Sequence, residues 1–175
     1  MPATTKTLGL LRHAKSDWDA AAARDIDRPL NARGRDAARR LGGYFKSTAT
    51  MWDLVLCSPA MRTRETAMRI ESALAAALDP VFDERLYMAS SADLLALIRR
   101  LDDAYASVLV IGHNPGLHDL ARALLGASGG DAADDLRGKF PTGGYAEFTL
   151  EGPWKRGAAG PAKLRRFITP RGLPA

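Results

Sequence analysis

Residues 8–15 read LGLLRHAK, an apolar run that ends in an arginine, a histidine and a lysine. The apolar half has the composition of a buried strand, and the polar half stands where such a strand would reach solvent. Ligands of open α/β sheets bind outside the carboxyl ends of parallel strands. An arginine fork beside an imidazole suits a phosphate dianion held next to a nucleophile. Arg12 and His13 are therefore candidate phosphate-binding and catalytic residues.

Two further apolar runs end in the same way. Residues 54–57 (LVLC) lead into a Ser-Pro pair with Arg62 following, and residues 108–112 (VLVIG) lead into His113. Because the carboxyl ends of parallel strands meet at one edge of a sheet, the three strand ends are expected to converge on a single basic pocket.

Helix-like segments alternate with these runs. We predict strands over 6–12, 53–57, 80–84, 107–112, 145–150 and 164–168, and helices over about 32–46, from Ser58-Pro59 to Leu78, from a cap at Ser91 to Leu101, and from Pro115-Gly116 to Leu125. Asn31 is the expected N-cap of the first helix. The alternation favours a layered α/β/α sandwich, with a mostly parallel sheet and an antiparallel edge made by the last two strands. Residues 126–144, rich in glycine and aspartate, are predicted to form a mobile loop.

The 175 residues fit one domain, which we place at residues 6–170 between tails 1–5 and 171–175. No apolar stretch approaches the roughly 18 residues that a membrane span needs, and the first residues lack the apolar region of a signal peptide. The single cysteine, Cys57, excludes an internal disulfide and fits a reducing compartment. A soluble cytoplasmic protein without membrane association is expected.

The net charge of +5 and the isoelectric point near 9.7 raise the possibility of a nucleic-acid ligand. However, the basic residues alternate with acidic or small ones, as in residues 33–40, and no aromatic and basic side chains form a stacking platform. We therefore expect no nucleic acid, and interpret the positive charge as attraction for a phosphorylated partner, either a protein or a small molecule.

Three motifs occur in order along the chain: residues 12–15 (RHAK), 58–63 (SPAMRT) and 112–115 (GHNP). In these motifs the chain resembles the histidine phosphatase superfamily, whose fold is phosphoglycerate mutase-like, and within it the short SixA-type phosphohistidine phosphatases. Residues 28–31 (RPLN) and 140–143 (FPTG) support the resemblance, which spans about residues 6–170. Ala14 departs from the commoner Arg-His-Gly form of the first motif, and this puts the substrate in doubt more than the mechanism.

The resemblance implies that His13 is the nucleophile and forms a covalent phosphohistidine that water then hydrolyses. A neutral imidazole suits this task, because it can attack phosphorus near neutral pH without a separate base. By the same resemblance, Arg12 and Arg62 hold the nonbridging phosphoryl oxygens, and His113 donates a hydrogen bond or a positive charge to them. No metal or cofactor is expected, since His113 and His118 do not share a helix face and no acidic cluster accompanies them.

The sequence identifies the general acid and the residues at the rim of the site less clearly than the nucleophile. Many relatives carry a glutamate after the third strand, and Glu84 is its nearest match, with Asp17 a weaker candidate; both carboxylates could instead be simply solvated. A phosphorylated imidazole needs an acid less, because its own protonation helps it leave. Lys15 and Ser16 are expected either to contact phosphate or a protein partner, or to line the rim.

A cysteine nucleophile is excluded by spacing. Cysteine phosphatases use a Cys-x5-Arg loop, whereas only four residues separate Cys57 from Arg62. A buried small apolar side chain is the expected role of Cys57.

Three functions remain in order of preference. The first is a phosphatase that hydrolyses phosphohistidine or another phosphoramidate. The second is a small-metabolite phosphomonoesterase of the same superfamily. However, the chain lacks the long insertions that cover small metabolites in such enzymes, so an open pocket suited to a protein surface is expected. The third is a noncatalytic phosphate-binding module, which the presence of both His13 and His113 disfavours.

Overall fold

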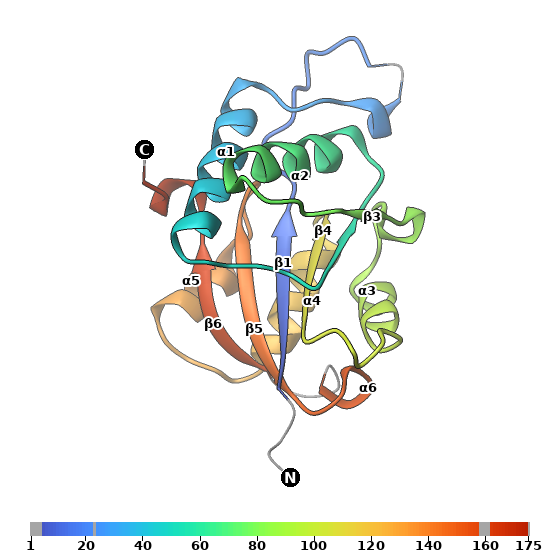
Figure 1. Ribbon diagram of the computed structural model, residues 1–175, viewed down its shortest axis with the longest axis vertical. Coiled ribbons are helices and arrows are strands. Elements are labelled where there is room, and N and C mark those ends of the chain that lie inside the picture. Colours follow the sequence, from blue (N-terminus) through green and yellow to red (C-terminus); the bar gives the residue numbers. More distant parts are fainter. Residues whose placement is uncertain (1–4, 23, 158–161, 175) are drawn as a thin grey trace.

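A computed structural model describes residues 5–22, 24–157 and 162–174 (Figure 1). Within these residues six strands form one sheet in the order β3-β2-β4-β1-β5-β6. They are β1 (Thr5–Arg12), β2 (Leu54–Cys57), β3 (Val81–Phe82), β4 (Ser107–Gly112), β5 (Tyr145–Glu151) and β6 (Lys163–Ile168). The first four strands are parallel, β5 runs antiparallel to β1, and β6 runs antiparallel to β5. The predicted mostly parallel sheet with an antiparallel edge is confirmed.

Helices cover both faces of this sheet, as the α/β/α prediction requires. Helices α1 (Ala32–Ser47) and α2 (Met61–Leu74) pack on one face, the near side in Figure 1. Helices α3 (Ser91–Ile98), α4 (Gly116–Leu125) and α5 (Asp131–Gly138) pack on the other. The short helix α6 (Trp154–Gly157) lies between β5 and β6. In the part of the chain that is described, no helix is both long and apolar enough to cross a bilayer.

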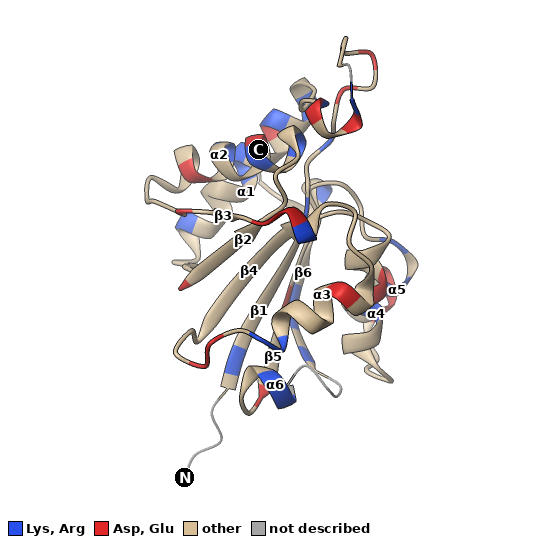
Figure 2. Cartoon of the chain, turned by 90° about the vertical axis from the view of Figure 1, so that its right-hand side faces the viewer, with Lys and Arg blue, Asp and Glu red and all other residues tan. Residues whose placement is uncertain are grey.

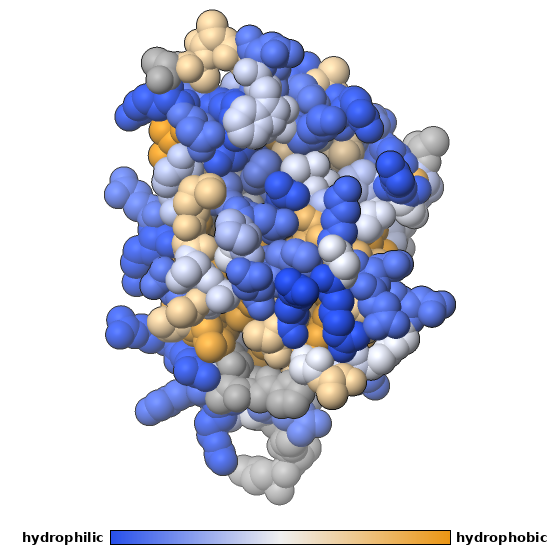
Figure 3. All heavy atoms as spheres, turned by 180° about the vertical axis from the view of Figure 1, so that it is seen from behind, coloured by the Kyte–Doolittle hydropathy of each residue, from blue (hydrophilic) through white to orange (hydrophobic). Residues whose placement is uncertain are grey.

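The alternation of side chains along β1 explains the two-faced core. Leu8 and Leu10 join the cluster that contains α3 and α4, whereas Leu11 points to the opposite face, against α1 and α2. Successive side chains of a strand alternate between faces, so a strand buried on both sides reads as a continuous apolar run. Charged residues gather on helices and loops and leave the middle of the sheet largely free of charge (Figure 2). On the far face, polar residues break the apolar surface into small patches (Figure 3).

Several predicted boundaries are wrong. Helix α2 is capped at Ala60 rather than at Ser58, and it ends at Leu74 because Ala75 adopts a left-handed conformation. Helix α3 begins one residue earlier than expected, with a capping box between Ser90 and Asp93. Strand β3 has two residues rather than five.

The predicted loop over residues 126–144 contains a helix, α5, so that prediction is also wrong. Only two of its residues, Ala133 and Leu136, are buried, and they lie three positions apart on the face that meets the core. Two apolar positions among glycines and aspartates are too weak a periodic signal to predict a helix, and tertiary packing stabilises it instead.

The start of α1 holds the segment that follows His13. Asn31 is the N-cap, as predicted, and its side-chain oxygen accepts a hydrogen bond from the Gly34 amide at 2.9 Å. The Asn31 amide in turn donates to the Lys15 carbonyl at 3.0 Å. A Cβ at Gly34 would lie 2.0 Å from that carbonyl oxygen. Only glycine therefore permits this close approach of helix and loop.

We predict opposite effects for alanine at two glycines of α1. Gly34→Ala should destabilise the protein by roughly 1–3 kcal/mol, because the new methyl group overlaps the Lys15 backbone. Gly43→Ala is the matched control: nothing lies within 4 Å of its Cβ position, so higher helix propensity should stabilise the protein by up to about 1 kcal/mol. Urea unfolding measures both. Equal stability changes in the two variants would contradict the close approach.

Candidate active site

Three adjacent strands deliver the predicted site residues to one place. Strands β2, β4 and β1 are neighbours in the sheet, and Arg12 at the end of β1 pairs in register with Gly112 at the end of β4. The next residues, His13 and His113, therefore emerge side by side, with ring centroids 5.3 Å apart. Arg62 reaches the same place from the first turn of α2.

The His13 ring is buried, and its tautomer is set by the backbone. Its Nδ1 lies 2.7 Å from the Ala14 carbonyl oxygen. A carbonyl oxygen only accepts, so Nδ1 carries the proton and Nε2 keeps a free lone pair. Burial disfavours the charged imidazolium and lowers the pKa of His13 from 6.5 to about 3, with the positive charges of Arg62 and Arg12 acting in the same direction. His13 is thus neutral at physiological pH and keeps the free nitrogen lone pair that a nucleophile requires.

Two arginine side chains lie beside the histidines, each anchored by a backbone carbonyl. Arg12 Nη1 donates to the Phe140 carbonyl at 3.0 Å, and Arg62 Nη1 donates to the Asp25 carbonyl at 2.8 Å. The Nε atoms of both arginines are buried and have no hydrogen-bond partner among the described residues. An unpaired buried donor is costly, so two of them on neighbouring cations indicate a site for an anion. Burial, followed by the nearby Arg62 charge, also lowers the pKa of Arg12.

His113 is buried, with a hydrogen-bond partner at one ring nitrogen and none at the other among the described residues. Its Nε2 lies 2.7 Å from the Ser58 hydroxyl, and its Nδ1 is buried without a partner in the described structure. The ring of Tyr87 packs edge-on against it at 5.5 Å. Burial, and then the charge of Arg62, lowers the pKa of His113 to about 4. The Ser58 hydroxyl can donate to Nε2, which leaves the proton of the neutral ring on Nδ1 for a ligand.

Asp25 is a site residue that the sequence analysis missed. Its Oδ2 accepts hydrogen bonds from Arg62 Nη2 at 3.0 Å and from the Tyr87 hydroxyl at 2.7 Å, while Oδ1 accepts from Arg28 Nη2 at 2.9 Å. The Tyr87 bond, then Arg28 and Arg62, hold the pKa of this carboxyl well below its usual range. Its only sequence signal is its place three residues before Arg28, in a stretch of mixed charge.

Arg28 shapes the loop on this side of the site. It is buried, donates to the Ser16 hydroxyl, and stacks on the Trp18 ring with its guanidinium carbon 3.6 Å from the ring centroid. Ser16 is buried as well, so its hydroxyl is engaged within the protein. Lys15, in contrast, is exposed at the rim. Phosphate contacts of Lys15 and Ser16 stay predictions.

The two acid candidates lie outside this hydrogen-bond network. Glu84 is exposed in the 3-10 turn Glu84–Leu86, which leads directly to Tyr87. Asp17 accepts a hydrogen bond from the Asp19 amide at 3.0 Å, which closes a local turn. A general-acid role for Glu84 stays a prediction.

Cys57 has the role that the sequence analysis proposed, and His118 has a structural role. Cys57 is buried, and burial raises the pKa of its thiol to about 12, which leaves no thiolate for nucleophilic attack at neutral pH. His118 lies in α4, with its Nε2 2.7 Å from the Leu136 carbonyl oxygen. It serves the packing of α4 and α5.

Comparison with known proteins agrees with the fold. The family model of the histidine phosphatase superfamily (branch 1) matches residues 8–93, which include His13 and Arg62. An uncharacterized protein of Mycobacterium tuberculosis is 37% identical over 163 residues, covering 92% of this chain and all of the relative.

Solved structures extend the likeness. A candidate phosphohistidine phosphatase SixA from Nakamurella multipartitia is 30% identical, with a TM-score of 0.83 over 97% of this chain and 99% of that one. The protein histidine phosphatase SixA complexed with tungstate is 25% identical, with a TM-score of 0.71 over 94% of this chain and 97% of that one.

Because the native pKa values of both histidines lie below 6.5, acid should destabilise the protein. Between pH 6.5 and about 4, the unfolded chain binds a proton at each ring that the folded chain does not bind. Each histidine should then cost about 1.4 kcal/mol of stability per pH unit as pH falls. Urea unfolding from pH 6 to 4.5 should show a smaller slope in His13→Gln and in His113→Gln. An unchanged slope in both variants would show that the rings are already protonated in the native state.

Asp25 should position Arg62 for anion binding. Asp25→Ala removes charge-assisted hydrogen bonds worth about 1.5–3 kcal/mol, so inorganic phosphate should bind roughly 10- to 100-fold more weakly, and kcat/KM should fall in parallel. Asp27→Ala is the matched control, since Asp27 lies in the same 3-10 turn but pairs with the exposed Arg24. Tighter phosphate binding by Asp25→Ala would instead identify Asp25 as a competitor for the anion site.

Proposed function

The chain belongs to the histidine phosphatase superfamily, and from this premise we propose that it hydrolyses phosphohistidine through a covalent phosphohistidine intermediate on His13. One observation carries the proposal. His13 is buried and neutral, and its Nε2 keeps a free lone pair. Beside it lie two arginines whose buried Nε atoms have no hydrogen-bond partner among the described residues. This combination supplies a nucleophile, together with unpaired N–H donors for the phosphoryl group that it would attack.

The first chemical step transfers the phosphoryl group to the enzyme. The His13 Nε2 lone pair forms a bond to phosphorus as the bond from phosphorus to the substrate imidazole breaks. That imidazole, protonated on its other ring nitrogen, takes the bonding pair and leaves as a neutral ring. Arg12 and Arg62 stabilise the nonbridging oxygens, where charge accumulates in the transition state. No enzyme carboxylate is required to donate a proton to this leaving group.

The second step releases phosphate. A water oxygen bonds to phosphorus as the bond to His13 Nε2 breaks, both water protons stay with the dihydrogen phosphate, and Nε2 regains its lone pair. The Nδ1 proton, held by the Ala14 carbonyl, keeps the ring in the same tautomer throughout. The Nδ1–H of His113 donates to a phosphoryl oxygen in both steps. Glu84 would be needed only with an alkoxide leaving group.

A phosphorylated protein is the substrate class that we favour. Lys15 and Trp18 at the rim are exposed, with Trp18 retaining 77% of its accessible surface, which supports an open mouth. The likeness to SixA proteins supports the same assignment. A reducing compartment such as the cytoplasm fits the single buried thiol of Cys57.

We expect the protein to release phosphate from phosphoramidate in metal-free buffer with a chelator. His13→Ala should lower turnover on the order of a thousandfold or more, because it removes the nucleophile. His118→Ala is the matched control, since it removes a histidine that lies outside the site. Labelled phosphate trapped on the native protein should be stable in alkali and lost in acid, as a nitrogen–phosphorus bond requires.

The alternatives give different results. Faster turnover of sugar phosphates than of phosphoramidate would favour a metabolite phosphomonoesterase. Phosphate binding without turnover of any substrate would favour the noncatalytic module. Full activity of His13→Ala would overturn the proposed nucleophile.

A further inference from the structure

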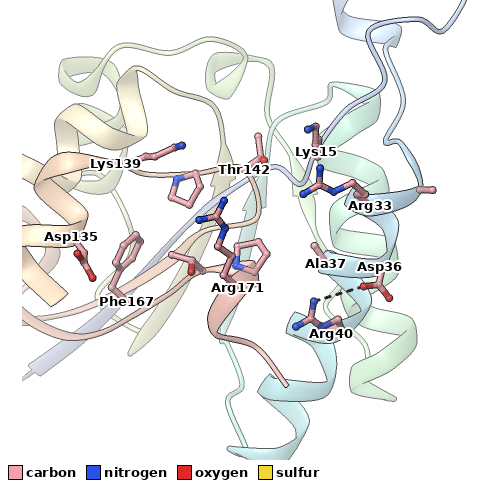
Figure 4. Close-up of a pocket in the computed structure, with 14 residues that line it drawn as sticks. Lys15, Arg33, Asp36, Ala37, Arg40, Asp135, Lys139, Thr142, Phe167 and Arg171 are labelled. Carbon is pink, nitrogen blue, oxygen red and sulfur yellow. Dashed lines mark ion pairs between the residues drawn. The ribbon is translucent and has the colours of Figure 1, made fainter. Parts of the chain in front are cut away.

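A second surface feature lies beside the catalytic residues. A groove of about 970 Å³ runs between α1 and the segment that follows α5. Lys15 and Arg33 stand on one wall, Lys139 stands on the other, and Arg171 lies between them (Figure 4). We call this the basic groove. None of the four catalytic candidates, Arg12, His13, Arg62 and His113, lines it.

Acidic side chains compensate little of its charge. Five cations line the groove. Four of them are exposed and form no ion pair within the described residues, namely Lys15, Arg33, Lys139 and Arg171, whereas the half-buried Arg40 pairs with Asp36. Of the two carboxylates on the groove, Asp36 is already engaged by Arg39 at 2.9 Å and by Arg40 at 3.8 Å. Asp135 is the one other carboxylate among the described residues that line the groove. The basic groove is therefore a strongly positive surface that the protein does not neutralise itself.

The basic groove is connected to the catalytic candidates by neighbouring residues on two segments of chain. The Phe140 carbonyl anchors Arg12, and the next two residues, Pro141 and Thr142, line the groove. On the opposite wall, Lys15 follows His13 by two positions. The groove therefore lies near the position where a substrate attacked by His13 would sit.

Charge also differs between the two sides of the site. On the β2 side, the carboxylate of Asp25 lies against Arg62 and Tyr87. On the β6 side, the basic groove lies over Phe167 and Pro170. The basic groove would attract an acidic partner to the β6 side. This attraction would determine how the partner is oriented at the catalytic residues.

We propose that the basic groove binds an acidic polypeptide segment next to the phosphohistidine of the protein substrate. This inference rests on the proposed phosphohistidine phosphatase function. Carboxylates spaced along an extended chain, at about 3.3 Å per residue, can reach cations on separate walls. Phe167 and Pro170 add apolar surface for the peptide backbone and side-chain stems.

The test compares two synthetic phosphohistidine peptides, one flanked by aspartates and glutamates and one flanked by serines. The double variant Lys139→Glu/Arg171→Glu should lower kcat/KM for the acidic peptide at least about tenfold, because each reversal replaces attraction by repulsion. Turnover of the serine-flanked peptide and of phosphoramidate should change less than about twofold. Added salt should weaken the preference of the native protein for the acidic peptide.

The matched control is Arg69→Glu/Arg100→Glu, which changes the net charge equally at two exposed arginines that do not line the groove. An equal loss of kcat/KM for the acidic peptide in the two double variants would show that the effect comes from overall charge, and it would overturn the proposal. The same conclusion would follow if the native protein showed no preference for the acidic peptide.

Binding of the unphosphorylated acidic peptide separates this inference from the proposed function. The native protein and the control variant should bind it, and the groove variant should not, whether or not the protein turns over phosphoramidate. Failure of turnover with intact peptide binding would overturn the proposed function alone. Lack of peptide binding by the native protein, or tighter binding of a single-stranded oligonucleotide at the same residues, would overturn the acidic-peptide assignment.

Discussion

The buried guanidinium of Arg62 is the constraint on which the rest of the site depends. A buried charge is tolerated only when it is paired and hydrogen-bonded. Asp25 meets this requirement on one edge of Arg62, with both its carboxylate and its backbone carbonyl. Arg12 is anchored similarly by the Phe140 carbonyl. The remaining edges of both cations leave unpaired donors, and this local excess of positive charge favours a phosphate dianion.

The same environment determines the state of the two histidines. The low dielectric of the buried site and the charges of the neighbouring arginines both disfavour a protonated imidazole. The pKa values of His13 and His113 are therefore lowered. The cost is lower stability in acid. The gain is a His13 ring that is neutral over the physiological range, with its free nitrogen selected by the hydrogen bond to the Ala14 carbonyl. The proposed anion binding and the proposed nucleophilicity thus have one physical origin.

The antiparallel edge of the sheet gives the site its surroundings. The segment before β5 passes close to the strand end, where the Gly143 amide donates to the His13 carbonyl at 2.9 Å. One part of this segment anchors Arg12, and another part lines the basic groove. One short piece of backbone therefore contacts a residue proposed to bind the phosphoryl group and lines the groove proposed to select its carrier.

The sequence by itself determined the parallel core and the proximity of Arg12, His13, Arg62 and His113. Each follows a strand end that local apolar patterning marks, and the sheet topology brings those ends together. Helix α5 was not predicted, because its two buried residues give no clear helical periodicity.

Only the tertiary structure decided the ion pair of Arg62 with Asp25, the pairing of His113 with Ser58, and the basic groove. These contacts join residues 37 and 55 positions apart, or surfaces from several elements. Local periodicity carries no information about which distant side chains come into contact. Those contacts depend on how the elements pack and on which charges compensate one another in the folded chain.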